Sequence, residues 1–153
     1  MRKGDILFVR GNSCISKIIN YVDGPYSHVA LALSDDTILE AQRFTESRIV
    51  KNYHVDYDVY RLKLTDEQRD MLVECALRLI GRDYDYTQVF GTLFNRLFRI
   101  ARKNNRNKFI CSELIVEMLY SIGYIDECSR ESLIHSTPNE LYKYIHSAHN
   151  TLQ

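Results

Sequence analysis

The periodicity of the apolar residues changes near Thr65, and this change limits the folds that the chain can adopt. Before Thr65, short runs rich in β-branched and aromatic residues are separated by polar turns, and after it apolar residues recur at helical spacing. A period of two is typical of half-buried strands, whereas a period near 3.6 is typical of amphipathic helices. Strands followed by helices predict the α+β class, here an antiparallel sheet or partial barrel packed against helices.

The first part of the chain contains most of the predicted strands. They are "DILFV" (5–9), the two halves of "SHVALALSDDTILEAQ" (27–42), "SRIVKNY" (47–53) and "VDYDVYRLK" (55–63), and "SCISKIINYV" (13–22) predicts a short helix. The polar turn inside residues 27–42 is typical of an antiparallel hairpin. We predict an odd loop of residues 34–36, because it sets Gln42 opposite His28 and places Glu40 diagonally from His28 on the same face.

The second part of the chain carries helix signals. Helices are predicted over residues 65–81, 86–101 and 112–122, and in "STPNELYKYI" (136–145). Thr65 and Gln68 form a capping box at the start of the first helix, and Thr137 and Glu140 form one at the start of the last. The apolar stripe of the first helix comprises Met71, Leu72, Cys75, Ala76, Leu79 and Ile80, which assigns Cys75 to the core.

Length and composition agree with a single domain over residues 1–153. The 20 basic and 20 acidic side chains cancel, so the net charge indicates no partner. Four cysteines, at positions 14, 75, 111 and 128, lack the paired short spacings of a zinc site or a disulfide framework. The sequence shows neither a secretory signal nor an apolar run long enough to span a membrane, so we expect a cytoplasmic protein with reduced cysteines.

Cys111 opens the predicted helix of "NKFICSELIVEMLY" (107–120), where a helix exposes unpaired backbone N–H groups. A cysteine attacks as the thiolate, and a helix N-terminus or a basic neighbour lowers the thiol pKa from about 8.5. The position therefore suits a nucleophile. The alternative interpretation is a buried core thiol, because free cysteine is among the most buried residue types.

His28 is the candidate general base. In "SHVALAL" it shares one strand face with two alanines, and this shallow face would let a helix approach and bring Cys111 toward the imidazole. Glu40 is the first candidate for a third residue that orients the imidazole, and Gln42 is the second. The alternatives are a structural strand histidine and a solvent-facing glutamate.

A candidate stabiliser of negative charge lies in "IGRDYDYTQ". A tyrosine phenol and the backbone N–H at the cysteine could together receive the oxyanion of an attacked carbonyl. We choose Tyr84 for this role and assign most of the 11 tyrosines to packing.

A series of motifs occurs in an order that resembles a known family. The motifs are "GDILFV", "YSHVALAL" followed by "TILEA", "GRDYDY", "FICSELIVEML" and "STPNEL". Together they resemble the circularly permuted branch of the NlpC-type, papain-like cysteine amidases and peptidases. That branch has bacterial and poxviral members and is related to the lecithin retinol acyltransferase group. Its histidine precedes its cysteine, as here, and a triad is defined by geometry rather than by chain order.

The resemblance implies a permuted papain-like fold and acyl transfer to water or another acceptor. Residue by residue, it implies Cys111 as nucleophile, His28 as general base and Glu40 as the third residue. It also implies Tyr84 on the oxyanion side. The substrate would be an amide or ester in a peptide or a lipid, cleaved through an acyl-enzyme. No cofactor or metal is implied, and a zinc site at Cys111, His28 and Glu40 would lack the usual local ligand pairs.

Two further interpretations remain open. The alternative to a hydrolase is a catalytically silent binding module of the same fold, recruited to a membrane surface or a protein partner. Residues 96–108, "RLFRIARKNNRNK", carry six basic side chains and no acidic one, which suits peripheral binding to an anionic membrane or, more plainly, a solvated helix face. The nearby aromatic residues form one helix stripe rather than a stacking platform, which argues against nucleic acid.

Overall fold

A computed structural model describes residues 1–11, 23–41, 47–78 and 110–151. Several predictions fall outside these ranges: the helices over residues 13–22 and 86–101, the residues Cys14, Gln42 and Tyr84, and the basic segment 96–108. They stay predictions.

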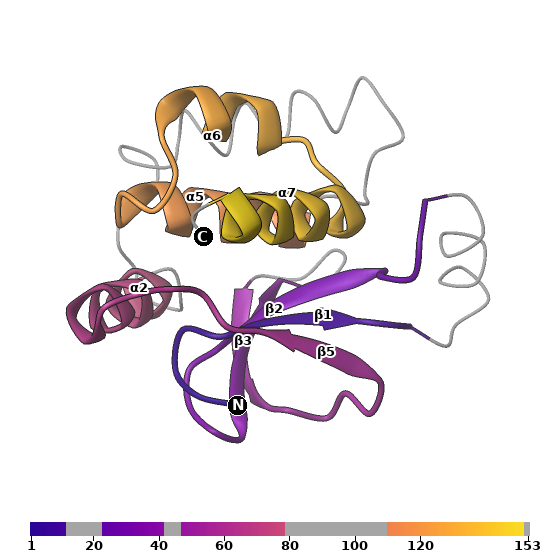
Figure 1. Ribbon diagram of the computed structural model, residues 1–153. Coiled ribbons are helices and arrows are strands. Elements are labelled where there is room, and N and C mark those ends of the chain that lie inside the picture. Colours follow the sequence, from indigo (N-terminus) through magenta and orange to yellow (C-terminus); the bar gives the residue numbers. More distant parts are fainter. Residues whose placement is uncertain (12–22, 42–46, 79–109, 152–153) are drawn as a thin grey trace.

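The described strands form one five-stranded antiparallel sheet in the order β4-β3-β2-β1-β5. The strands are β1 (Ile6–Val9), β2 (His28–Ala32), β3 (Thr37–Ala41), β4 (Ser47–Lys51) and β5 (Tyr57–Tyr60). Each lies within a segment that the sequence predicted as a strand. The sheet is open, and together with the helices it confirms the α+β class (Figure 1).

The hairpin of β2 and β3 has the predicted odd register. Leu31 lies opposite Leu39 and Ala32 opposite Ile38. The turn is closed by the Leu33 N–H, which donates to the Thr37 carbonyl at 2.8 Å. Because side chains alternate between faces with a period of two, this register places Glu40 on the same face as His28 and diagonal to it.

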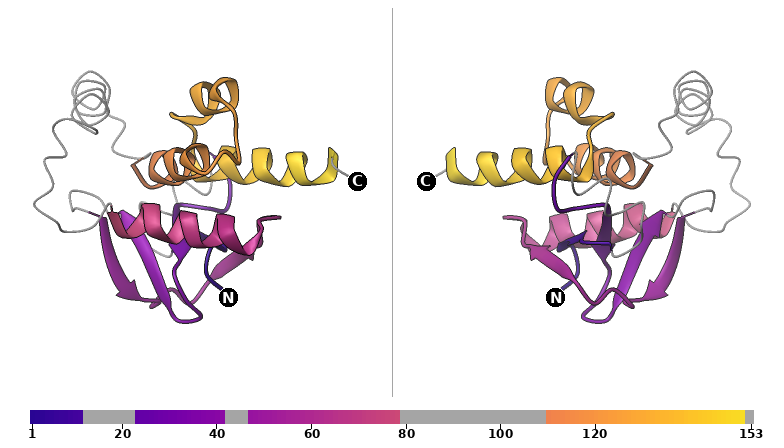
Figure 2. Two further views of the ribbon diagram at one scale, coloured as in Figure 1. Left: turned by 90° about the vertical axis from the view of Figure 1, so that its left-hand side faces the viewer. Right: turned by 90° about the vertical axis from the view of Figure 1, so that its right-hand side faces the viewer.

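Four helices are described: α2 (Asp66–Arg78), α5 (Ile110–Ser121), α6 (Glu127–Leu133) and α7 (Pro138–Thr151). Helices α5 and α7 lie over the sheet, and α6 lies on the side of these two helices that faces away from the sheet (Figures 1 and 2). Both capping boxes are confirmed, with Gln68 N–H donating to Thr65 Oγ1 at 3.2 Å and Glu140 N–H donating to Thr137 Oγ1 at 3.1 Å. The short α6 was not predicted, because its sequence "ECSRESL" has no apolar stripe.

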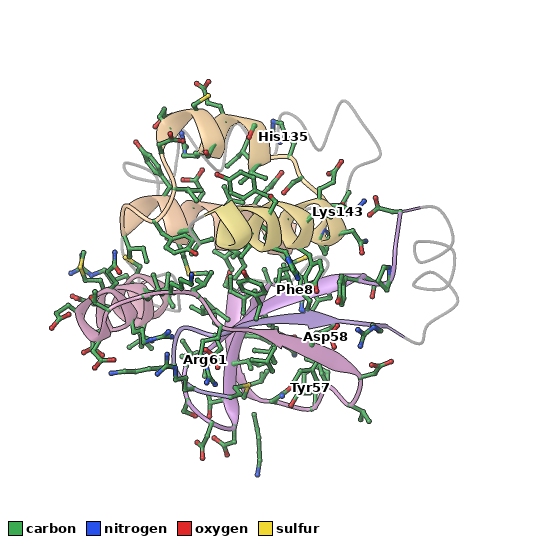
Figure 3. All side chains as sticks on the ribbon, viewed as in Figure 1. Phe8, Tyr57, Asp58, Arg61, His135 and Lys143 are labelled. Carbon is green, nitrogen blue, oxygen red and sulfur yellow. The ribbon has the colours of Figure 1, made fainter. Side chains whose placement is uncertain are left out.

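The helix that carries Cys111 packs on the face of the sheet opposite to the predicted one. Val29 and Leu31 of β2 share a buried cluster with Cys111 and Ile115 of α5. The alanine face instead belongs to a smaller cluster of Leu7, Ala30, Ala32 and Ile38. The prediction was wrong because the larger side chains of Val29 and Leu31 bury more apolar area against a helix than alanines do. Phe8 lies in the same layer, between the sheet and α7, with its ring centroid 5.1 Å from that of Tyr142 (Figure 3).

Helix α2 departs from its predicted stripe. Leu72 and Ala76 are buried and Cys75 is half-buried against the core, as expected, but Met71 is 47% exposed. Arg69 is buried instead, and its guanidinium donates to the Leu62 carbonyl at 2.7 Å and the Lys3 carbonyl at 3.0 Å. An apolar pattern cannot reveal a buried arginine of this kind, because its burial depends on carbonyl groups that lie outside the helix.

Among the described residues, no helix is both long and apolar enough to cross a bilayer.

Glu113 lies in the first turn of α5, and its carboxyl group is buried. Its Oε1 lies 3.3 Å from Nδ1 of His135. Burial raises the pKa of Glu113 to about 7, although the hydrogen bond with His135 opposes the shift. When folding raises the pKa of a carboxyl group, the free energy of unfolding decreases as the pH rises from the pKa of the unfolded state toward that of the folded state.

We therefore expect Glu113→Gln to raise the free energy of unfolding at pH 8 but not near pH 5, where the native carboxyl is already protonated. The gain should be at most about 3 kcal/mol, given 1.36 kcal/mol per pKa unit. Urea unfolding at the two pH values measures it. Glu117→Gln is the matched control and should destabilise, because it removes the ion pair of Glu117 with Arg130 at 2.8 Å. Equal effects of Glu113→Gln at both pH values would contradict the shift.

Candidate active site

Cys111 lies at the start of α5, as the sequence predicted; it is the second residue of the helix, and its side chain is buried. The first turn of a helix presents unpaired N–H groups and the positive end of the helix dipole. Backbone groups of Ser112 and Val29 hydrogen-bond to the sulfur and favour the thiolate. The cysteine is thus a member of the core cluster and also lies at a position that stabilises negative charge.

His28 contacts both Cys111 and Glu40. It is the first residue of β2, and its Nε2 lies 3.3 Å from Oε2 of Glu40. The ring also hydrogen-bonds to the Cys111 side chain. Because Nε2 faces the carboxylate, Nδ1 is the nitrogen left for the thiol. Because His28 lies at the end of β2, its ring can contact groups on both faces of the sheet. Cys111 belongs to the cluster on the Val29 face, and Glu40 lies on the other face.

The contact shifts the pKa values of both partners toward an ion pair. Burial lowers the pKa of His28, but the hydrogen bonds with Cys111 and Glu40 outweigh burial and raise the pKa to about 9. Burial raises the pKa of Cys111, but the hydrogen bond and charge of His28 outweigh it and lower the pKa below its usual value. Both shifts favour the form of the pair in which Cys111 is a thiolate and His28 an imidazolium.

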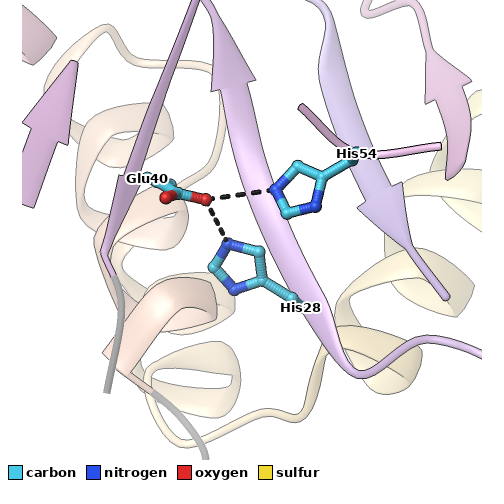
Figure 4. A group of neighbouring side chains, drawn as sticks. All are labelled: His28, Glu40 and His54. Carbon is cyan, nitrogen blue, oxygen red and sulfur yellow. Dashed lines mark hydrogen bonds and ion pairs between the residues drawn. The ribbon is translucent and has the colours of Figure 1, made fainter. Parts of the chain in front are cut away.

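Glu40 is fully buried on β3, and four of the described side chains hydrogen-bond to its carboxylate. Arg48 Nε and Nη2 donate to Oε1 at 3.0 and 2.7 Å, and the Tyr53 hydroxyl donates to Oε1 at 2.8 Å. Nε2 of His54 lies 3.1 Å from Oε2, so the two histidine rings converge on one carboxylate oxygen (Figure 4). Burial raises the pKa of Glu40, but these partners hold it far below its ordinary value.

Sequence reasoning found Cys111, His28 and Glu40, which the structure brings together, but it missed the partners of Glu40. Arg48 lies directly opposite Glu40 in the pairing of β3 with β4, so a cross-strand charge pair was the available signal. Tyr53 and His54 follow β4 in an irregular segment, where no periodicity points to a partner.

Asn139, from the "STPNEL" motif, holds the segment that leads into β2. Its Oδ1 accepts from the Tyr26 N–H at 2.9 Å, and its Nδ2 donates to the Tyr26 carbonyl at 2.7 Å and to Asp23 at 3.0 Å. Gly24 packs closely here: its φ is +133°, and an added Cβ would lie 2.8 Å from Asn139 Oδ1. The start of α7 thereby fixes the chain two residues before His28.

One group of described side chains has the composition of a metal site. The ligand atoms of His28, Glu40 and His54 all lie within 4.8 Å of one another. However, the guanidinium of Arg48 already neutralises the carboxylate, and a metal would have to displace the proton of an imidazolium at His28. Hydrogen bonding accounts for the arrangement without an ion.

An open antiparallel sheet with a strand histidine, and a cysteine at the start of a helix packed on that sheet, are the features of papain-like cysteine hydrolases with histidine placed before cysteine. Residues 1–140 match the family model of the permuted papain-like amidase enzymes, YaeF/YiiX, C92 family, and the chain belongs to this family. The match confirms the resemblance and the fold class, and at a coarse level it identifies a cysteine hydrolase. Comparison with curated proteins gives no match.

The ion pair can be measured by alkylation. We expect Cys111 to react with iodoacetate faster than the exposed Cys128 near pH 6, where an ordinary thiol with a pKa of about 8.5 is mostly protonated. The rate at Cys111 should fall as the pH rises through about 9, because loss of the imidazolium charge at His28 weakens attraction of the anionic reagent. Neutral iodoacetamide should show no such fall. Peptide mass mapping after pulse labelling follows each cysteine, and equal rates at Cys111 and Cys128 would contradict the ion pair.

A second prediction concerns Asn139. Asn139→Ala leaves the buried amide groups around Tyr26 without partners, so we expect a loss of about 2–4 kcal/mol in the free energy of unfolding. Alkylation of Cys111 in the folded protein should also slow, because His28 is no longer held in place. Urea unfolding and pulse labelling measure the two effects. Lys143→Ala, on the exposed side of α7, is the control and should change neither.

Proposed function

We propose that the chain is an amidase or ester hydrolase that uses Cys111, His28 and Glu40 as a triad. The observation that supports this most strongly is that a single imidazole contacts both a helix-start thiol and a buried carboxylate. A core thiol does not need a charged histidine, and burial of an anion such as Glu40 is unfavourable unless its partners offset the lost hydration. The arrangement therefore fits a catalytic role better than a packing role.

The reaction begins from the thiolate and imidazolium form of the pair, which both pKa shifts favour. The Cys111 thiolate attacks the carbonyl carbon of an amide or ester, and the negative charge passes to the carbonyl oxygen. The Cys111 backbone N–H, at the N-terminus of α5, is a donor for that oxyanion. The imidazolium of His28 then gives its proton to the leaving amine or alcohol, and an acyl-thioester forms on Cys111.

Deacylation uses the same histidine as a base. Neutral His28 takes a proton from water, or from an alcohol or amine acceptor, as that group attacks the thioester. The carboxylate of Glu40 keeps Nδ1 directed at the reacting atoms through its contact with Nε2. Whether the acyl group comes from a peptide or a lipid is a property of the substrate-binding surface. A membrane role for residues 96–108 and an oxyanion role for Tyr84 stay predictions.

Trapping the acyl-enzyme tests the proposal. We expect intact-mass spectrometry after exposure to a lipid extract or a peptide library to show an added acyl mass on Cys111. The Cys111→Ser variant should lack the thioester, which hydroxylamine cleaves, and Cys128→Ser should retain it. A silent binding module would give no adduct and no enhanced alkylation of Cys111. That combination of results would overturn the proposal.

A further inference from the structure

The two oxygens of the Glu40 carboxylate are used by different partners. Both nitrogens that Arg48 offers, Nε and Nη2, donate to Oε1. Oε2 instead faces Nε2 of His28 and Nε2 of His54, at 3.3 and 3.1 Å. The Tyr53 hydroxyl lies between the two oxygens, 2.8 Å from Oε1 and 3.0 Å from Oε2.

This division is unexpected for an arginine and a carboxylate. The guanidinium fork matches a carboxylate best when its two N–H groups donate to the two oxygens in parallel. Such a pairing would draw Oε2 toward Arg48 and away from His28. Arg48 and His28 therefore compete for the same oxygen, and a further group must keep Oε2 on the histidine side.

His54 is placed to do this. Its ring is largely buried, with 12% of the side chain exposed, and its centroid lies 5.6 Å from that of His28. The backbone holds it there, because the His54 N–H donates to Asn52 Oδ1 at 3.1 Å and the Asn52 N–H donates to the Asp36 carbonyl at 2.7 Å. The Tyr53 ring packs beside it, with centroids 4.3 Å apart.

We propose that His54 is a positioning residue of the site, which holds Oε2 of Glu40 against His28 and prevents Arg48 from taking both carboxylate oxygens. The inference rests on the proposed function, since it assigns His54 a role in keeping His28 oriented and charged. It also explains why a second histidine converges on the carboxylate when the triad uses only one.

The consequence appears at His28. Within the part of the chain that the structure describes, the charged and titratable groups that face His28 or its carboxylate partner are Cys111, Glu40, His54, Arg48 and Tyr53. If Oε2 turns toward Arg48, the imidazolium keeps the thiolate but loses the carboxylate as a partner. The pKa of His28 then falls below about 9, and the high-pH fall in iodoacetate alkylation of Cys111 moves to lower pH.

The experiment compares His54→Gln with His54→Leu. The amide nitrogen of glutamine can reach the place of Nε2 and donate to the same oxygen, whereas leucine fills the space without a donor. We expect the fall in iodoacetate alkylation to stay within a few tenths of a pH unit of the native position in His54→Gln. In His54→Leu it should move down by about one unit, a tenfold change in proton affinity.

A second background tests the competition itself. Arg48→Lys keeps the positive charge but removes the planar fork. Adding His54→Leu to Arg48→Lys should therefore shift the alkylation profile less than His54→Leu does alone. Equal shifts in the two backgrounds would overturn the competition, because the effect of His54 would then not depend on the fork.

The controls separate this inference from the proposed function. His135→Gln alters a histidine that contacts Glu113 rather than Glu40, so it should leave the profile unchanged. Far-UV circular dichroism and urea unfolding establish that each variant is folded at the pH of labelling. A native Cys111 that reacts no faster than Cys128 would overturn the proposed triad. A reactive native Cys111 with the same profile in His54→Leu would overturn only the role of His54.

Discussion

The buried carboxylate of Glu40 is the group on which the arrangement of the site depends. Removing an anion from water costs several kcal/mol unless charged and polar partners replace the lost hydration. Here the replacement comes from a guanidinium, a phenol and two imidazoles, supplied by β2, β4 and the segment after β4. Arg48 is held to Oε1, the two histidines to Oε2, and Tyr53 lies within reach of both oxygens, so the burial of a single charge fixes the relative positions of several side chains.

The same charge extends its influence to a thiol on the other side of the sheet. Glu40 favours the imidazolium of His28, and the imidazolium favours the thiolate of Cys111. Neither step requires Glu40 to approach the sulfur. Because His28 is the first residue of its strand, its ring lies where the two faces of the sheet meet, and it connects a polar network on one face with the core cluster on the other.

The sequence predicted those parts of the structure that depend on local chemistry. The hairpin register followed from the loop after Leu33, and the capping boxes at Thr65 and Thr137 followed from residues three positions apart. The errors concern contacts between distant segments. The face on which α5 packs depends on which side of β2 buries more apolar area. Arg69 is buried because backbone carbonyl groups of other segments accept hydrogen bonds from its guanidinium. The contacts that Tyr53 and His54 make with Glu40 depend on the path of the irregular segment after β4.

The order of the functional residues along the chain divides the site into two parts. The stretch from His28 to His54 contains the carboxylate and all of its described side-chain partners, so the charged network belongs to the strands and the segment that follows β4. The helices contribute the thiol of Cys111 and, through Asn139, the contact that holds the chain before β2. Since geometry rather than chain order defines a triad, the proposed function can join a base on the strands to a nucleophile on a later helix in this permuted order as well as in the unpermuted one. What the permuted order demands is accurate docking of α5 and α7 on the sheet, and the buried side chains of Val29, Leu31 and Phe8 supply the apolar surface for it.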